Sequence, residues 1–146
     1  MVTTKPATQK DHPFIHRVHR LAYRAMIERQ FGYWDEMRQS GMLDCDLATD
    51  CYEIVLWEDE PCGYFSYSAD GGRLHLIDFA IHPRYQRQGI GSRILDLLKR
   101  RAQQNHQPLT LGAYKTNKGA RRFYEKHGFQ QSGATTVHVL YRWNHL

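Results

Sequence analysis

Long apolar runs are missing from this sequence of 146 residues. A membrane-spanning helix needs roughly 18 or more apolar residues in a row, and no segment approaches that length. The N-terminal stretch MVTTKPATQKDHP also lacks the apolar core of a secretory signal peptide. We therefore expect no membrane insertion and a cytoplasmic location.

Cysteine is scarce as well, with three residues: Cys45, Cys51 and Cys62. Three is an odd number and no CxxC pair is present, so neither a disulfide framework nor a zinc site is expected. His12, His16 and His19 share one helix face at a spacing that could bind a metal ion. No carboxylate or cysteine partner is evident for them in the sequence, and we expect no metal.

What the chain does have is a hydrophobic content of 41% and a formal net charge of +5, with a pI near 9.2. This length and apolar content suit one domain over residues 1–146, and no repeat or linker divides it. A basic surface can attract nucleic acid, anionic lipid or a phosphorylated cofactor. No aromatic–basic RNA motif and no recognition-helix pattern is present, so a nucleic-acid partner is not expected.

The first half of the chain reads as a strand, two helices and a meander. After a short strand in TTKPAT, apolar residues at steps of three and four predict a helix that begins at Asp11, has Pro13 in its first turn and ends near Gly32. A weaker, acidic helical segment covers residues 33–50. Turn clusters separate three strands of an antiparallel meander, at 52–57, 62–68 and 73–81.

Helices alternate with strands in the second half. One helix is predicted from Gly89 to about Asn105 and another over residues 117–128, with the short strand PLTLGAY between them and the strands FQQSG and TVHVLYRW after them. The portion around residues 73–113 should form a right-handed parallel crossover. The whole order, β-α-α-β-β-β-α-β-α-β-β, indicates an α/β class with a mixed sheet and helices on its faces.

The segment HPRYQRQGIGSRILDLLKRR places two glycines, Gly89 and Gly91, at the start of an amphipathic helix. The first N–H groups of a helix have no intrahelical partner, and glycine lets a phosphate approach them closely. The Lys-Ser/Thr of a Walker A loop does not follow, and GIGSRI lacks the third glycine of a dinucleotide-binding fingerprint. The loop alone therefore indicates an anion site without naming its ligand.

Two motifs together carry a family resemblance. AIHPRYQRQGIGSRILDLL resembles the acetyl-CoA loop of the GNAT-type N-acetyltransferase superfamily, whose pattern Gln/Arg-x-x-Gly-x-Gly/Ala is matched by Gln86, Gly89 and Gly91 after a strand that ends in Ala80 and Ile81. NKGARRFYEKHGF resembles the second family motif at Asn117, Ala120, Phe123, Tyr124, Gly128 and Phe129. Both motifs stand in the family's order and spacing, and the predicted elements match over nearly the whole chain.

The resemblance implies a fold and a co-substrate, acetyl-CoA. The fold is a single GNAT-like domain with a mostly antiparallel six- to seven-stranded sheet, a parallel splayed pair of strands and about four helices. The amides of residues 87–92 should wrap the pyrophosphate of coenzyme A, and a bulge expected at Phe79-Ala80-Ile81 should offer main chain to the pantetheine arm. The cofactor-binding residues implied are Phe79, Ala80, Ile81, Gln86, Arg87, Gln88, Gly89, Ile90, Gly91, Ser92, Arg93, Asn117 and Tyr124.

Amine attack on a thioester needs a group that takes the proton of the amine and one that protonates the leaving thiolate. The resemblance implies that Tyr124 is the proton donor, although a core tyrosine is the structural alternative. His75 and then Asp78 are the candidate bases; an ordinary strand histidine, or a reaction without a dedicated base, is the alternative.

The acceptor amine stays open, because family membership does not choose it. Aromatic and acidic residues of the second helical region suit a cationic amine or form a solvated face: Tyr33, Trp34, Asp35, Glu36, Asp44, Asp46 and Asp50. We expect an enzyme, a monomer or homodimer, that transfers acetyl to a primary amine of a small molecule or protein by direct attack in a ternary complex. The alternatives are a non-catalytic acyl-CoA-binding sensor and a protein N-terminal or lysine acetyltransferase.

Overall fold

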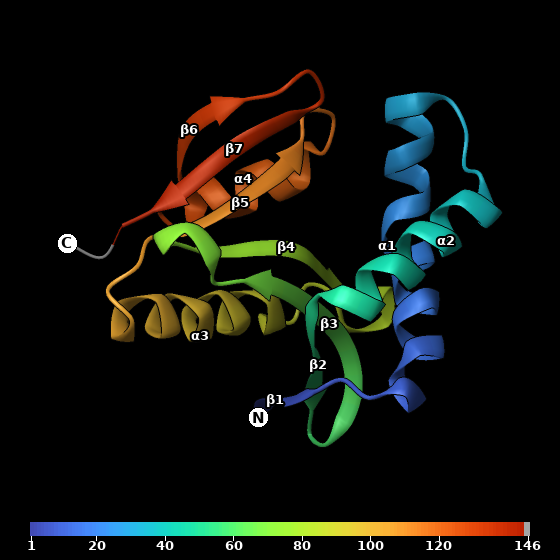
Figure 1. Ribbon diagram of the computed structural model, residues 1–146, viewed down its shortest axis with the longest axis horizontal. Helices are drawn as coiled ribbons and strands as arrows, with labels where there is room; N and C mark the ends of the chain where they lie inside the picture. Colours follow the sequence, from blue (N-terminus) through green and yellow to red (C-terminus); the bar gives the residue numbers. More distant parts are fainter. Residues whose placement is uncertain (145–146) are drawn as a thin grey trace.

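Helices and strands follow one another in the order that the residue patterns predicted. The computed structural model describes residues 1–144 (Figure 1). The α-helices in that range are α1 (His12–Phe31), α2 (Glu36–Thr49), α3 (Ile90–Gln104) and α4 (Lys118–Lys126). The strands are β1 (Val2–Pro6), β2 (Cys51–Trp57), β3 (Glu60–Ser68), β4 (Leu74–Ile81), β5 (Leu109–Tyr114), β6 (Gln130–Ala134) and β7 (His138–Trp143). Short 3-10 turns are η1 (Gln9–Asp11), η2 (Asp70–Gly72) and η3 (Pro83–Tyr85).

The strands form one mixed sheet in the order β1-β2-β3-β4-β5-β7-β6. Neighbouring strands are antiparallel except β4 and β5, which run parallel because α3 connects them as a crossover. Figure 1 shows α3 along one side of the sheet and the α1–α2 pair at a distance from it. Over the described residues, the mostly antiparallel sheet with one parallel pair and four α-helices confirms the predicted fold class.

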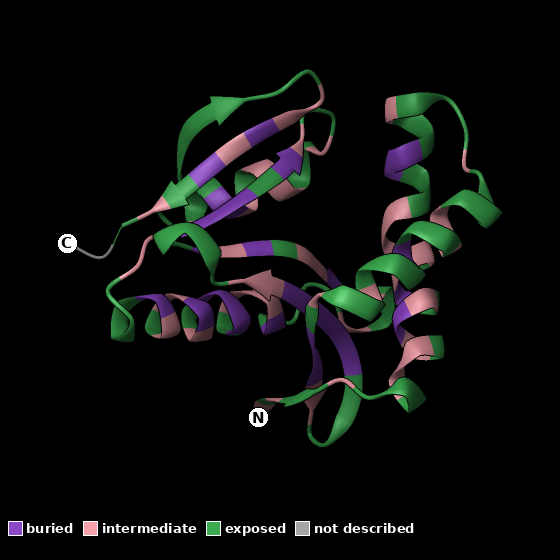
Figure 2. Ribbon diagram, viewed as in Figure 1, coloured by how far each residue is buried: buried purple, intermediate pink, exposed green. Residues whose placement is uncertain are grey.

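Two hydrophobic clusters pack on opposite faces of the sheet. Ile54 and Tyr64 belong to the cluster under α1 and α2, whereas their chain neighbours Val55 and Phe65 belong to the cluster under α3 and α4. Successive strand residues point to opposite faces, so α1 and α2 cover the face opposite α3. Figure 2 shows the buried stripe of α3 and the full exposure of β6 at the sheet edge.

Strand β4 separates from β5 halfway along its length. The two strands pair at three positions, the last being Leu76 with Leu111, and beyond it their ribbons diverge (Figure 1). On the other side of β4, the register with β3 shifts so that Ile77 has no Cα partner. The bulge therefore lies at Ile77, and the predicted position at Phe79-Ala80-Ile81 is wrong.

The position of the bulge follows from side-chain packing. Leu74 and Leu76 before it, and Phe79 and Ile81 after it, all pack into the cluster under α3, although strict alternation would put the second pair on the other face. One extra residue in β4 returns the side chains after the bulge to the face that packs against α3. The same shift turns Asp78 and Ala80 toward α1.

The ends of α1 differ partly from the prediction. Asp11 stands at the N-cap position, but its side chain does not cap the helix and instead accepts a hydrogen bond from the Thr8 amide at 2.8 Å. Pro13 lies in the first turn and Gly32, with φ of 88°, ends the helix as predicted. The next helix, α2, is capped by Asp35, which accepts from the Arg38 amide at 3.1 Å.

One partly buried ion pair joins α3 to the sheet. The Arg101 guanidinium donates to both carboxylate oxygens of Glu53, at 2.5 and 2.9 Å, and Thr4 donates to the same carboxylate at 2.9 Å. Burial by itself raises the pKa of Glu53, but the hydrogen bonds from Arg101 and Thr4 outweigh it and hold the pKa below the ordinary 4.5. The ionised carboxylate of Glu53 therefore stabilises the fold at pH values above the ordinary pKa of 4.5. This stabilisation is lost as the pH falls through the lowered pKa.

Glu53→Gln is expected to lower the free energy of unfolding by about 1–2 kcal/mol at neutral pH, because a partly buried Arg101 loses its charged partner. The loss should shrink as pH falls below about 4, where the wild-type carboxylate also becomes protonated. Urea unfolding at both pH values measures it. Glu58→Gln, at an exposed side chain, is the matched control, and equal effects of the two variants would contradict the assignment.

Candidate active site

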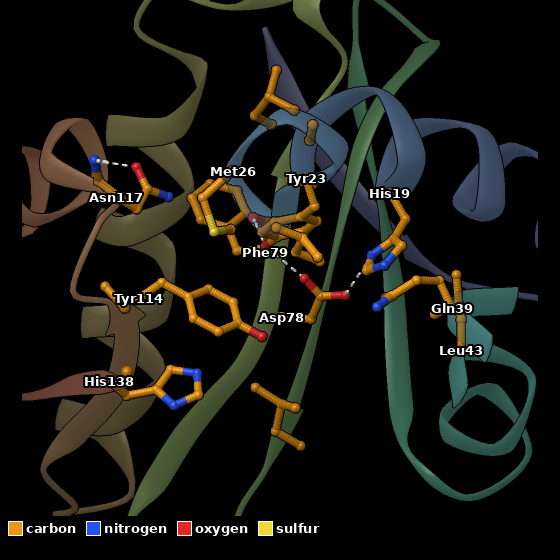
Figure 3. Close-up of a pocket in the computed structure, with 18 of the residues that line it drawn as sticks. His19, Tyr23, Met26, Gln39, Leu43, Asp78, Phe79, Tyr114, Asn117 and His138 are labelled. Carbon is orange, nitrogen blue, oxygen red and sulfur yellow. Dashed lines mark hydrogen bonds and ion pairs between the residues drawn. The ribbon is translucent and has the colours of Figure 1, made fainter. Parts of the chain in front are cut away.

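One cavity of about 470 Å³ lies where β4 and β5 diverge (Figure 3). Its walls come from α1 and α2 on one side, from β5, β7 and α4 on the other, and from the free half of β4 between them. The polar and titratable side chains that line it are His19, Tyr23, Gln39, Asp46, Asp78, Gln86, Tyr114, Asn117, Tyr124 and His138. A cavity of this size accommodates the reacting groups of small ligands.

Asp78 is the centre of a hydrogen-bond cluster in this cavity. Tyr23 donates to one carboxylate oxygen at 2.7 Å and Tyr64 to the other at 2.8 Å. His19 contacts the Tyr64 hydroxyl at 3.1 Å and lies 3.7 Å from the Asp78 carboxylate. Burial, followed by the charge of Asp78, raises the pKa of Tyr23 and of Tyr64, so both phenols stay protonated and keep donating.

The free edge of β4 faces the same cavity. The Phe79 carbonyl lies 2.9 Å from the Tyr23 hydroxyl, as a second acceptor beside Asp78 for its one proton, and the Ile81 carbonyl accepts from Gln86 Nε2 at 2.8 Å. Both carbonyls therefore point away from β3. Because the N–H and C=O of one residue face the same side in an antiparallel strand, the amides of Phe79 and Ile81 face the opening too. β5 pairs with β4 no further than Leu76, which leaves this edge open to a ligand.

Tyr124 lies at the back of the cavity. Its ring packs near Phe129 and Tyr141 in the core cluster, and it also lines the cavity wall. Burial, and then the negative charge of Asp78, raises its pKa above the ordinary 10. The phenol therefore keeps its proton at physiological pH. Tyr124 is both a core residue and an available acid, so the two interpretations of the sequence are compatible.

The turn before α3 leaves its backbone amides free. No amide of residues 87–92 donates to another described residue, whereas the Arg93 amide closes the first helical turn onto the Gly89 carbonyl at 3.2 Å. Gly89 is the N-cap, with φ of 82°, and has no side chain to cap these groups. Arg87, with φ of 63°, is also left-handed. Unpaired amides at a helix N-terminus form an anion site.

Gly91 and Ser92 pack against α4. A Cβ added to Gly91 would lie 3.2 Å from Phe123 Cζ and 3.7 Å from Phe79 Cζ, so a side chain here fits only if the Phe123 ring shifts by a few tenths of an ångström. The φ of Gly91 is not positive, unlike those of Arg87 and Gly89 in the same loop. Ser92 Oγ lies 2.9 Å from His127 Nε2, and His127 Nδ1 lies 2.8 Å from the Phe123 carbonyl. A carbonyl only accepts, so Nδ1 carries a proton and donates it to the Phe123 carbonyl.

His75 and the predicted residues 87–93 do not line the cavity. His75 lies on β4 before the strands diverge, and its Nδ1 is 2.7 Å from Thr110 Oγ1. Burial and then the charge of Arg73 lower its pKa. The guanidinium of Arg93 lies over the Trp57 ring, 5.6 Å from its centroid. Of the two candidate bases, the structure brings Asp78 and not His75 into the cavity with Tyr124.

Sequence reasoning did not identify Tyr23, Tyr114 or His138 as residues of the site. Tyr23 follows His19 by four residues and so shares its helix face, which was a usable signal. Tyr64 reaches Asp78 from β3, and Tyr114 and His138 face Asp78 across the opening (Figure 3). No local pattern indicates these contacts, because they depend on the register of different strands. Burial and then the charge of Asp78 raise the pKa of Tyr114, and burial lowers that of His138.

The predicted acidic mouth is divided in the structure. Asp46 lines the cavity, whereas Asp35 caps α2 and Asp44 bonds to His16 Nε2 at 2.7 Å.

Within residues 1–144, no group of three or more His, Cys, Asp or Glu side chains is placed to hold a metal ion. No helix of the same range has both the length and the apolar character that a membrane crossing requires. The three cysteines are free thiols.

Comparison with known proteins agrees with this geometry. The family model "Acetyltransferase (GNAT) family" matches residues 15–129. No curated protein matches the sequence. Among solved structures, the PaiA N-acetyltransferase of Thermoplasma acidophilum in complex with coenzyme A has a TM-score of 0.77 at 11% identity, with 99% of each chain covered.

Two further structures are similar at low identity. A GNAT family acetyltransferase of Elizabethkingia anophelis with acetyl-CoA bound has a TM-score of 0.74 at 16% identity, covering 99% of this chain and 98% of its own. An acetyltransferase of Thermus thermophilus has a TM-score of 0.74 at 22% identity, covering 98% and 96%. These likenesses support the fold, and the family model spans more than half of the sequence. The chain therefore belongs to the GNAT family of acetyltransferases.

Proposed function

We propose that this protein transfers an acetyl group from acetyl-CoA to a primary amine by direct attack in a ternary complex. The observation that carries the proposal is that one cavity contains the free edge of β4, the Asp78 carboxylate and the protonated phenol of Tyr124. A strand edge can bind the amide groups of a pantetheine arm, and the two side chains supply a proton acceptor and a proton donor.

The residues present fit acetyl-CoA. The free amides of residues 87–92 and the positive end of the α3 dipole suit a pyrophosphate. The amides of Phe79 and Ile81 suit the pantetheine amides, with Gln86 and Asn117 in the adjoining wall. Asn117 caps α4 by accepting from the Ala120 amide at 3.2 Å, so its side-chain N–H₂ stays available to a ligand.

The protein's contribution to chemistry is proton transfer and positioning. Bound acetyl-CoA supplies an activated acetyl thioester. Asp78, held by two phenols, accepts the proton that the acceptor amine must lose, and Tyr124 delivers a proton to the sulfur that leaves. The hydrogen bonds from Tyr23 and Tyr64 fix the carboxylate in one orientation, which favours transfer in a defined direction. His75, the other candidate base, does not line the cavity.

Tyr124→Phe tests the proton donor, because it keeps the ring and removes the hydroxyl. We expect kcat to fall on the order of tenfold to a hundredfold, while the affinity for acetyl-CoA stays nearly unchanged. This decrease is at the low end of general-acid effects, because a CoA thiolate is already a fair leaving group. Steady-state kinetics and calorimetry on one preparation measure both quantities. A variant with a lower melting temperature and full turnover would instead make Tyr124 a purely structural residue.

The proposed activity is tested by titrating the protein with acetyl-CoA in a calorimeter and then recording thiol release over a set of amines, including lysine peptides and peptide N-termini. Binding followed by amine-dependent thiol release supports an acetyltransferase, and the best acceptor identifies its class. Binding without release for any amine would favour an acyl-CoA sensor. Absence of binding would overturn both.

A further inference from the structure

The cavity has a charge opposite to that of the protein as a whole. The chain carries 20 Lys and Arg residues and a net charge of +5. The described residues that line the cavity nevertheless include two carboxylates, Asp46 and Asp78, and neither a lysine nor an arginine. Since an acidic cavity inside a basic protein attracts cations, the acceptor site favours a positively charged ligand.

The two carboxylates differ in their partners. Both oxygens of Asp78 already accept hydrogen bonds from Tyr23 and Tyr64. The Asp46 side chain makes no hydrogen bond or ion pair with a described residue. Partial burial, and then the charges of Asp50 and Asp78, raise the pKa of Asp46, while His19 acts in the opposite direction. Negative charge is thus concentrated near Asp46 without a fixed cation from the protein.

The wall that carries Asp46 is otherwise largely apolar. Met42 and Leu43 of α2, Met26 and Ile27 of α1 and Ile77 at the bulge all line the same cavity. Met42 and Ile77 are substantially exposed there, at 52% and 44%. A cavity that combines this apolar surface with two carboxylates complements a hydrocarbon chain that carries two positive charges.

We infer that the acceptor is an alkyl amine with a second cationic group, and that Asp46 binds the group that is not acetylated. The inference rests on the proposed acetyl transfer. The reacting ammonium first loses one proton to solvent, and the nitrogen of the free amine bonds to the acetyl carbon. As the carbon–sulfur bond breaks, the nitrogen gives its second proton to Asp78. Tyr124 protonates the sulfur and is reprotonated by the proton that Asp78 received. The second ammonium keeps its proton and its ion pair with Asp46 throughout.

Length-matched acceptors test the inference directly. Cadaverine carries two amino groups, n-pentylamine carries one, and aminovalerate replaces the second by a carboxylate. We expect kcat/KM to be highest for cadaverine, lower for n-pentylamine and lowest for aminovalerate. The same order should hold for shorter and longer homologues of the three compounds. The advantage of cadaverine over n-pentylamine should be about fivefold or more at low salt, and it should shrink as salt screens the partly exposed pair.

Asp46→Asn is the diagnostic variant. It should lower kcat/KM for cadaverine about fivefold more than it lowers kcat/KM for n-pentylamine. Asp44→Asn is the matched control, because it removes the same charge from the same helix at an exposed residue outside the cavity lining. The control variant should keep the wild-type preference for the diamine.

The outcomes separate this inference from the function on which it rests. Equal use of the diamine and the monoamine by the wild type, or an Asp46→Asn variant that loses both equally, overturns the role of Asp46 and leaves acetyl transfer standing. Preference for aminovalerate overturns the cationic acceptor as well. No thiol release with any amine, despite acetyl-CoA binding, overturns the proposed function and the inference together.

Discussion

Replacing Gly91 with valine is expected to abolish acetyl-CoA binding while the chain stays folded. The first added carbon already comes within 3.2 Å of the Phe123 ring and valine adds two methyl groups beyond it, so we expect the start of α3 and the Phe123 ring to be pushed apart. The free amides of residues 87–92 then no longer converge on one anion. Loss of two charge-assisted hydrogen bonds, at about 1.5–3 kcal/mol each, raises Kd by about two to four powers of ten.

The fold should survive this substitution, because overpacking costs about 1–3 kcal/mol against a typical stability of 5–15 kcal/mol. Calorimetry with acetyl-CoA and a thermal melt on the same sample measure the two effects. Gly41→Ala is the control, because an added Cβ there meets nothing within 4 Å and the residue lies in α2 away from the loop. Wild-type affinity in a folded Gly91→Val protein would refute the role of the loop.

Asp78→Asn is expected to lower kcat on the order of a hundredfold, because the amide keeps the shape of the carboxylate but cannot accept the amine proton. An asparagine oxygen can still accept from one of the two phenols, so we expect only a modest loss of stability. Acetyl-CoA affinity should change little. Steady-state kinetics with the best acceptor measures the effect, and Asp44→Asn again controls for the loss of one negative charge.

The same assay decides between the two candidate bases. The pKa of His75 lies below the ordinary 6.5, so its neutral, proton-accepting form predominates above that pH and is lost as the pH falls through the lowered value. If His75 is the base, His75→Ala flattens the acid limb of the pH–rate profile. We expect instead that His75→Ala keeps the wild-type profile, because its ring is bonded to Thr110 outside the cavity. A flattened limb would return the role to His75.

Local patterns were sufficient for most of the fold. The spacing of apolar residues and the turn clusters placed each helix and strand within a few residues of its observed position, because both signals are written in neighbouring residues. Glycines at helix ends behaved as predicted at Gly32 and Gly128, both with positive φ. The unpaired amides of residues 87–92 were also predictable, since they depend on one turn and one helix start.

Contacts between distant segments were not predictable in this way. The bulge was predicted too late in β4, because its position at Ile77 depends on which side chains face α3, and local alternation does not show that. Tyr23 and Tyr64 reach Asp78 from positions 55 and 14 residues away, so the cluster exists only after α1 and β3 are packed. The strand pattern ranked His75 before Asp78, and only the bulge and the end of the β5 pairing show that Asp78 and not His75 lines the cavity.

The sequence by itself determined the order of the elements, the phosphate-type loop and the family resemblance, because each is encoded in contiguous residues. Only the tertiary structure decided which acids share a cavity with Tyr124. Asp46 and Asp78 line it together because α2 folds back over the divergence of β4 and β5, whereas Asp44, two residues before Asp46, turns to His16. Three to four residues make one helical turn, so a shift of two residues sends a side chain to another face and gives it a different role.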